Sequence, residues 1–248
     1  MFAGFQRNPY INFSAFDETL LEKRLVITID GPAASGKSTT ARRVAERLGY
    51  MYIDTGAMYR AVTLDVIRRK IDLRDEKKVV GIAASASIEL KPGPFKLHLF
   101  LNGEDVTAEI RSSEVTRSVS AVSRIRGVRE ALVRIQRRLG RDGGVVLEGR
   151  DIGTVVFPGA DLKIFMVADI RARSRRRAAE MRDRGEATTE EQIAEEIRRR
   201  DKLDSEREES PLVKAEDAVE LDTSDLDIDE QVEFVVRKAN ELLRKHRT

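Results

Sequence analysis

Cysteine and tryptophan are both absent from this chain of 248 residues. Without cysteine there is no disulfide framework and no thiolate metal site, which fits a reducing compartment. The sequence contains no run of about eighteen or more apolar residues, so we expect no transmembrane helix. Its first residues also lack the basic stretch followed by an apolar run that marks a signal peptide. We therefore expect a cytoplasmic protein with no membrane partner.

An excess of one charge is also missing. The 45 Lys and Arg residues almost cancel the 43 Asp and Glu residues, and the formal net charge is +2 although 35% of all residues are charged. Because positive and negative charges nearly balance, the net charge does not favour nucleic acid as a partner of the whole molecule. The apolar fraction of 41% is that of a globular protein, and the length fits one large domain or one domain with an insertion. We expect a monomer.

Short apolar runs alternate with helical patterns along most of the chain. Five strands are predicted, at 25–30, 51–54, 144–149, 162–167 and 218–222. The spacing of apolar residues predicts helices at 37–48, 57–70, 128–139, 170–183, 189–206 and 229–245. Two of these helices begin with predicted capping boxes, Thr188 with Glu191 and Asp227 with Glu230. Strands joined by helical crossovers indicate an α/β fold with a five-stranded parallel sheet flanked by helices on both faces.

One segment breaks this alternation. Residues 86–107 alternate as strands do on both sides of KPGP, whose prolines and glycine predict a turn, so we expect an antiparallel hairpin there. With helical stretches at about 75–84 and 111–123, it makes residues 73–126 an inserted subdomain in a core formed by 24–72 and 127–248. Residues 1–23 contain aromatic residues without a period, and we expect a mobile extension.

A glycine-rich loop, GPAASGKST, follows the first predicted strand and opens the first helix. Its spacing of glycine, four residues, glycine, lysine and hydroxyl bends backbone N–H groups around polyphosphate. The predicted ATP-binding residues are Gly31, Pro32, Ala33, Ala34, Ser35, Gly36, Lys37, Ser38 and Thr39. Lys37 would neutralise the transferred phosphate, and Ser38 would offer its hydroxyl to Mg²⁺. The motif alone fits GTPases, transport ATPases, motors and small-molecule kinases, although a GTPase would need a guanine-reading Asn-Lys-x-Asp motif that the sequence lacks.

Two arginine-containing motifs, DTGAMYR (54–60) and EGRDIG (148–153), stand at the ends of predicted strands. Ligands of an open α/β sheet bind beyond the carboxyl ends of its strands, so both motifs would lie beside the glycine loop. Arg60 suits a two-pronged contact with phosphate oxygens. Arg150 and Asp151 would point into the same crevice, with a surface ion pair as the alternative explanation. Glu148 is a further candidate metal residue, acting through a magnesium-bound water.

Two further arginine clusters lie in predicted helices. The segment RRRDKLDSER places Arg200, Asp204 and Arg207 at spacings of four and three, on one helix face, where intrahelical salt bridges are the alternative explanation. Between Arg171 and Arg184 there are seven arginines and no lysine, which favours a site that holds phosphate oxygens. Nucleic-acid binding would also use a basic helix, but this one lacks interleaved aromatic residues for base stacking.

Together these motifs resemble those of bacterial cytidylate kinases, the nucleoside monophosphate kinases that phosphorylate CMP and dCMP. The resemblance covers about 25–245 and lies in the glycine loop and in DTGAMYRAVTLDV, GEDVTAEIRSSEV, VREAL, LEGRDIGTVVFPGADLKIFMVA and RDKLDSEREESPL. It implies a P-loop nucleoside monophosphate kinase fold with an enlarged monophosphate-binding insert, containing a small antiparallel sheet, and a mobile arginine-rich lid at about 171–190. It also implies ATP and CMP or dCMP as substrates and Mg²⁺ as cofactor.

The resemblance further implies roles for individual residues. Phosphate contacts of CMP are implied for Thr55, Arg60, Arg150 and Arg207, cytosine contacts for Ser120, Arg129 and Asp151, and sugar contacts for Arg200 and Asp204. The implied catalytic residues are Lys37, Arg150, Arg173, Arg176 and Arg177. A carboxylate beside a guanidinium suits cytosine, which presents an amino donor next to two acceptors. Uracil presents the opposite pattern, so a mismatched base would leave polar groups unpaired.

Departures from the family pattern are few. Thr55 stands where some members have serine and keeps the hydroxyl, whereas Leu203 and Ser205 replace arginines that some members carry, so no phosphate contact is expected from them. We expect direct in-line transfer of the γ-phosphate, without a phosphorylated enzyme. Two alternatives stay open: a kinase of the same fold acting on UMP, dTMP or shikimate, and an ATPase stimulated by nucleic acid.

Overall fold

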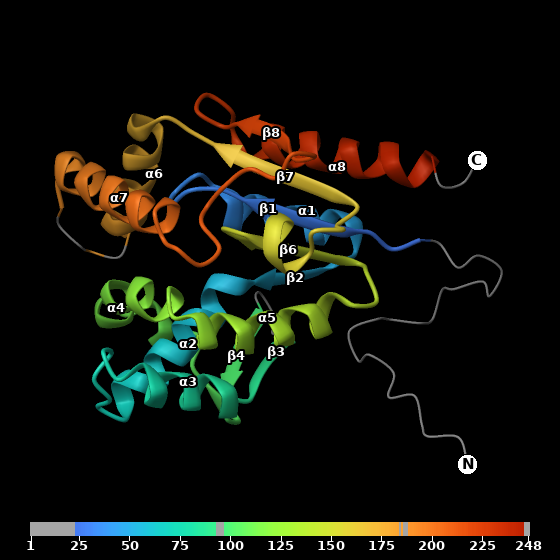
Figure 1. The fold of residues 1–248 in the computed structure, drawn as a ribbon. Coiled ribbons are helices and arrows are strands. Elements are labelled where there is room, and N and C mark those ends of the chain that lie inside the picture. Colours follow the sequence, from blue (N-terminus) through green and yellow to red (C-terminus); the bar gives the residue numbers. More distant parts are fainter. Residues whose placement is uncertain (1–22, 93–96, 184, 186–187, 246–248) are drawn as a thin grey trace, which may run out of the picture.

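A five-stranded parallel sheet runs through the centre of the molecule (Figure 1). Its strands are β1 (Val26–Asp30), β2 (Met51–Asp54), β6 (Val145–Gly149), β7 (Leu162–Val167) and β8 (Val219–Asp222), in the order β2-β6-β1-β7-β8. All five predicted strands are confirmed. The computed structural model describes residues 23–92, 97–183, 185 and 188–245, so the expected extension lies almost wholly outside the described residues.

Helices cover both faces of this sheet, as predicted. One face carries α1 (Lys37–Leu48) and α8 (Ile228–Lys245), and the other carries α2 (Thr55–Arg68) and α5 (Arg126–Gly140). Strand β6 shows the physical reason, because successive side chains of a strand point to opposite faces. Val145 and Leu147 pack with α2 and α5, whereas Val146 packs with α1 and α8. No helix in the described part of the chain is apolar over a stretch long enough to cross a bilayer.

A second, antiparallel sheet lies apart from the first (Figure 1). It consists of β3 (Ile88–Pro92), β4 (Leu97–Leu101) and β5 (Glu104–Asp105). The predicted hairpin is thus confirmed, although the two-residue β5 was missed and residues 93–96 of the turn lie outside the described residues. We call residues 76–123 the small-sheet region; it also contains α3 (Glu76–Ser85), the 3₁₀ turn η1 (Glu109–Arg111) and α4 (Ser113–Ser123).

Helices α6 (Ile170–Asp183) and α7 (Glu190–Ser205) pack on each other at one end of the main sheet (Figure 1). The cap of α7 is Thr189, whose side chain and that of Gln192 each accept the other's backbone N–H. The predicted box of Thr188 with Glu191 was therefore wrong by one residue. The second predicted box, at the start of α8, is confirmed by reciprocal hydrogen bonds of Asp227 and Glu230 at 2.9 and 2.8 Å.

Candidate active site

The loop between β1 and α1 borders a cavity of about 260 Å³, which we call the phosphate cavity. Gly36 caps α1 with φ 92°, a left-handed conformation that side chains rarely adopt. A Cβ on Gly31 would collide with the carbonyl oxygen of Met166 on β7. Both glycines of the motif are thus required by the backbone path. The loop lies at the carboxyl edge of the sheet, where α/β folds bind ligands.

Lys37 projects into this cavity from the first turn of α1. Its ammonium donates a hydrogen bond to the carbonyl oxygen of Pro32 at 3.0 Å, and the residue is buried. Burial, together with the positive charge of nearby Arg150, lowers the pKa of Lys37 to about 7. A bound polyphosphate would supply a negative counter-charge that stabilises the protonated form of Lys37.

Ser38 is tied to the carboxylate of Glu148 at the end of β6. The Ser38 hydroxyl donates to Oε2 of Glu148 at 2.8 Å, and the Tyr52 hydroxyl donates to Oε1 at 2.6 Å. Burial raises the pKa of Glu148, and the charge of Asp54 adds to the effect. Tyr52 was missed by the sequence analysis, since only the pairing of β2 with β6 brings it to Glu148.

The oxygen donors around Ser38 fit a magnesium ion. Ser38 uses its hydrogen to reach Glu148, which leaves the lone pairs of its oxygen for a cation. The described residues include no cluster of three or more His, Asp or Glu side chains that could hold a metal alone. Mg²⁺ suits such a place because it keeps several waters and takes further oxygens from substrate phosphates.

A second pocket, of about 70 Å³, adjoins the phosphate cavity. All nine residues with implied CMP contacts line it: Thr55, Arg60, Ser120, Arg129, Arg150, Asp151, Arg200, Asp204 and Arg207. Arg60, Arg150 and Arg200 line both spaces, so guanidinium groups stand where the two meet. These residues come from four stretches of the chain, at 55–60, 120–129, 150–151 and 200–207, which the fold gathers into one pocket. We call it the acceptor pocket.

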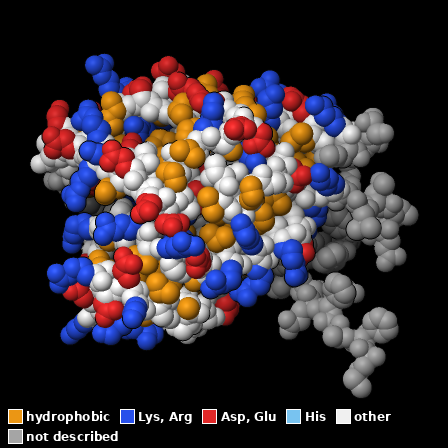
Figure 2. Space-filling model, in the orientation of Figure 1, with side chains coloured by type: hydrophobic (Ala, Val, Ile, Leu, Met, Phe, Trp, Pro, Cys, Tyr) orange, Lys and Arg blue, Asp and Glu red, His pale blue; other side chains and the backbone are white. Residues whose placement is uncertain are grey.

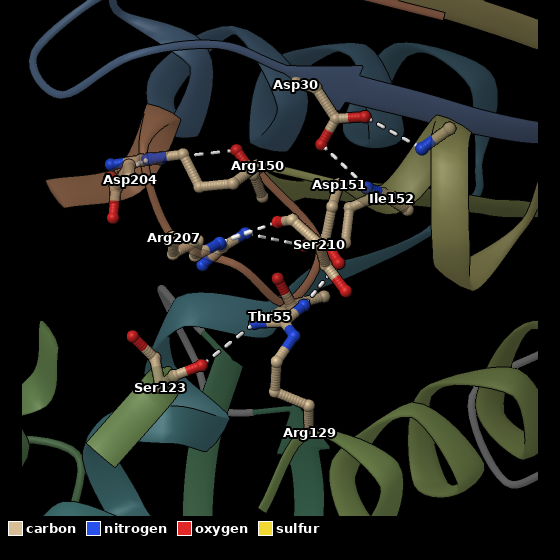
Figure 3. A network of polar contacts seen from close by, with 12 residues as sticks. Asp30, Thr55, Ser123, Arg129, Arg150, Asp151, Ile152, Asp204, Arg207 and Ser210 are labelled. Carbon is tan, nitrogen blue, oxygen red and sulfur yellow. Dashed lines mark hydrogen bonds and ion pairs between the residues drawn. The ribbon is translucent and has the colours of Figure 1, made fainter. Parts of the chain in front are cut away.

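Arg129 and Asp151 form a buried ion pair in this pocket. A second terminal nitrogen of Arg129 donates to the carbonyl oxygen of Ser123 at 3.1 Å, as Figure 3 shows. The ring of Tyr59 lies against the same guanidinium, with its centroid 5.4 Å from the central carbon. These contacts therefore hold the Arg129 guanidinium and the Asp151 carboxylate in a defined orientation without a ligand.

Arg150 and Asp204 form a second ion pair, with Nε of Arg150 2.7 Å from Oδ2 of Asp204 (Figure 3). Burial would raise the pKa of Asp204, but the charge and hydrogen bond of Arg150, together with the charges of Arg200 and Arg207, hold that pKa below its usual value. Arg207 does not share a helix face with them, because α7 ends at Ser205; this part of the prediction was wrong. Its Nε instead donates to the carbonyl oxygen of Ser210 at 2.6 Å.

Asp30, the last residue of β1, fixes the segment that carries Arg150 and Asp151. Its carboxylate accepts the backbone N–H groups of Ile152 at 2.9 Å and Gly153 at 2.8 Å (Figure 3). These residues open η2 (Ile152–Val156), a single π-helical turn that the sequence did not reveal. Burial raises the pKa of Asp30 to about 6, although both hydrogen bonds oppose the shift.

The three arginines of α6 with an implied catalytic role differ in their surroundings. Arg177 lines the phosphate cavity. Arg173 forms an ion pair with Asp201 and donates to the carbonyl oxygen of Ala33 at 3.3 Å. Arg176 donates to the hydroxyl of Thr223 at 3.2 Å and also contacts backbone carbonyl oxygens of the glycine loop and the segment after β8. A direct part in catalysis stays a prediction for all three.

Acidic and basic side chains interleave over the side of the molecule shown in Figure 2. Several basic residues of α6 and α7 are paired with neighbouring carboxylates, as Arg177 is with Glu180 at 3.0 Å. This agrees with the near-zero net charge of the chain.

Comparison with known proteins agrees with this geometry. The profile of the family described as Cytidylate kinase matches residues 27–241. The chain is 51% identical over 216 residues to a cytidylate kinase from Anoxybacillus flavithermus, covering 87% of this chain and 96% of that protein. It is 51% identical over 221 residues to the Geobacillus kaustophilus enzyme of the same name, covering 89% and 99%. The chain belongs to the cytidylate kinase family.

Proposed function

We propose that this protein transfers the γ-phosphate of ATP to CMP or dCMP, giving ADP and CDP or dCDP. One observation carries the proposal: nine residues with implied CMP contacts line a single pocket that opens beside the glycine loop. The relatives named cytidylate kinase, at about half identity over nearly their whole length, support the same acceptor.

On the donor side, the backbone N–H groups of residues 31–39 hold the triphosphate, and Lys37 bonds the oxygens of the transferred group. Ser38 and Glu148 would hold Mg²⁺, Ser38 directly and Glu148 through water. When bound, the ion neutralises phosphate oxygens as charge moves from the donor to the acceptor. Glu148 keeps Ser38 in the required rotamer by accepting its hydrogen.

On the acceptor side, Arg60, Arg150 and Arg207 hold the CMP phosphate, and Thr55 adds a hydroxyl. The acceptor is already an anion, so no strong general base is needed. The protein instead brings two polyanions together in line and neutralises the charge between them. The guanidinium groups that line both the phosphate cavity and the acceptor pocket support this role.

Cytosine is read by Arg129 and Asp151, with Ser120 beside them. Asp151 accepts from the exocyclic amino group, and Arg129 donates to the ring acceptors. Uracil lacks that amino donor and would leave the Asp151 carboxylate facing a carbonyl oxygen. A site built on polar groups in this way discriminates by about 10⁴ or more. Arg200 and Asp204 bind the sugar.

The expected parts of the chain have separate roles in the proposed reaction. Residues 73–126 form the monophosphate-binding insert within a core of 24–72 and 127–248, and 171–190 form the lid. The lid carries Arg177 over the transferred phosphoryl group and excludes water, which would otherwise hydrolyse ATP. We further propose that the enzyme is a cytoplasmic monomer with small-molecule substrates only.

The proposal is tested by ADP release from Mg-ATP with CMP, dCMP, UMP, dTMP, AMP, GMP or shikimate offered separately. Fast release with CMP or dCMP and slow release with the others is the expected result. Fast release with another acceptor would keep a kinase and remove the cytosine assignment. Release that needs no acceptor but rises with DNA or RNA would leave an ATPase of another class.

A further inference from the structure

Arg111 reaches the phosphate cavity from the small-sheet region and has no part in the function described above. It ends the η1 turn, and its side chain forms an ion pair with Asp54, with Nη2 of Arg111 2.7 Å from Oδ2 of Asp54. The other oxygen of Asp54 accepts the backbone N–H of Ala57 at 2.8 Å and caps α2. Arg111 and Asp54 together line the wall of the phosphate cavity.

The ion pair lies beside a second carboxylate, that of Glu148, in the wall of the cavity. Asp54 and Glu148 are direct register partners at the ends of the parallel strands β2 and β6, so two carboxylates stand side by side in the wall of the phosphate cavity. Glu148 is occupied by two hydroxyl donors, from Ser38 and Tyr52. In the described part of the chain no hydroxyl donates to Asp54, and Arg111 is the cation that forms an ion pair with it.

The charges in this corner interact strongly. Burial lowers the pKa of Arg111, but the negative charge of Asp54, its hydrogen bond and the charge of Glu148 together outweigh burial and raise that pKa above its ordinary value. Asp54 also adds to the raised pKa of Glu148, so its charge is felt at the carboxylate that holds Ser38. An uncompensated carboxylate at Asp54 would repel the phosphates that the cavity must accept.

We propose that Arg111 is a positioning residue for phosphoryl transfer, which holds the Asp54 carboxylate in an ion pair and so keeps its negative charge from acting on the phosphates. Arg111 acts through Asp54 and not by touching the substrate. This rests on the proposed function, because it assumes that two phosphate groups meet in the cavity.

A double-mutant cycle separates this role from direct phosphate binding. Arg111→Ala should lower kcat/KM for CMP by about 10- to 100-fold, since it frees one carboxylate charge beside two polyanions. Asp54→Asn should stay within about threefold of wild type because asparagine caps helices as well as aspartate does. The double variant Arg111→Ala with Asp54→Asn should recover most of the loss, and Arg111→Lys should keep most of the activity.

Arg68→Ala is the matched control. Arg68 also joins α2 to the small-sheet region, through Glu104 at 2.7 Å and through Glu109, but it does not line the phosphate cavity. If Arg111 only connected the small-sheet region to α2, Arg111→Ala and Arg68→Ala would lose activity to the same extent. We expect Arg68→Ala to keep wild-type kinetics. Thermal unfolding of every variant shows which of them are folded, and Arg111→Lys stands in should Arg111→Ala fail.

Binding of ATP in EDTA gives a readout that does not depend on the acceptor. Arg111→Ala should weaken ATP binding by about tenfold through charge repulsion, and Asp54→Asn should restore it in the double variant. If wild type fails with CMP but these shifts appear, the proposed function fails and this inference stands. A double variant no better than Arg111→Ala in both assays, or an Arg111→Ala enzyme equal to wild type, overturns it.

Discussion

Arg129 and Asp151 form an ion pair whose side chains are only 5% and 6% exposed. Oδ1 of Asp151 also lies 3.5 Å from Nη2 of Arg207, so one carboxylate forms ion pairs with two buried guanidinium groups. Such a pair costs desolvation free energy and is weak evidence for stability. Its fixed geometry in the acceptor pocket is better explained by recognition of a polar base.

Asp151→Asn should therefore affect both selectivity and stability. Because an amide presents a donor where the carboxylate presented only acceptors, kcat/KM for CMP should fall while that for UMP changes little. Two buried arginines lose their counter-charge, and the free energy of unfolding should drop by about 3 kcal/mol. Urea unfolding and acceptor kinetics measure the two effects, with Lys238→Ala on α8 as a surface control. A variant that keeps its CMP preference would contradict the cytosine assignment.

Arg177→Ala should lower kcat far more than it raises KM for CMP. Arg177 lines the phosphate cavity but not the acceptor pocket, so we expect its charge to act on the group in transfer. Arg171→Ala offers a control on the same helix, since Arg171 is exposed and faces a different groove. An increase in KM at unchanged kcat would argue against a role for Arg177 in the transfer step.

ATP binding at pH 8 should take up a proton at Lys37. Burial lowers the pKa of the free Lys37 to about 7, so the amine is mostly neutral at that pH. The negative charge of a bound triphosphate raises the pKa back towards the ordinary lysine value of about 10, and the amine becomes protonated. Calorimetry in buffers of different ionisation enthalpy measures the uptake. It should vanish in Lys37→Met, and proton release by wild type would be inconsistent with a buried neutral lysine.

Removing magnesium should abolish turnover, and Glu148→Gln should raise the Mg²⁺ concentration needed for half-maximal rate. Glutamine has a single acceptor oxygen for the two hydroxyl donors Ser38 and Tyr52, so Ser38 loses its fixed rotamer. Glu233→Gln, on the surface of α8, should leave the Mg²⁺ dependence unchanged. Equal Mg²⁺ dependence in wild type and Glu148→Gln would remove Glu148 from the proposed metal site.

Much of this arrangement follows from local sequence patterns. The five strands are short apolar runs, and parallel strands buried on both faces leave that signal without any knowledge of their partners. The motifs that follow predicted strands likewise indicate the edge of the sheet where ligands bind. Ser120 and Arg129, in contrast, were assigned to the acceptor only through the family resemblance.

The features that escaped prediction depend on contacts between distant segments. The π turn η2 is fixed by Asp30, more than a hundred residues earlier, and the two-residue β5 exists only through its pairing with β4. Likewise, TTEEQ offers two threonines with an acidic or amide residue three positions on, so pattern alone could not choose Thr189 as the cap of α7. Arg111 lies within the motif GEDVTAEIRSSEV, but no role was assigned to it, because its partner Asp54 is 57 residues earlier in the sequence.

The central claim, phosphoryl transfer to a cytosine nucleotide, is tested most directly by competition. Equal concentrations of CMP and UMP are offered to the enzyme with limiting Mg-ATP, and the CDP and UDP formed are measured by mass spectrometry. A polar site matched to cytosine predicts CDP in excess by about 10⁴-fold or more. Comparable amounts of CDP and UDP, or UDP in excess, would contradict the assignment of Arg129 and Asp151 as the residues that read the base.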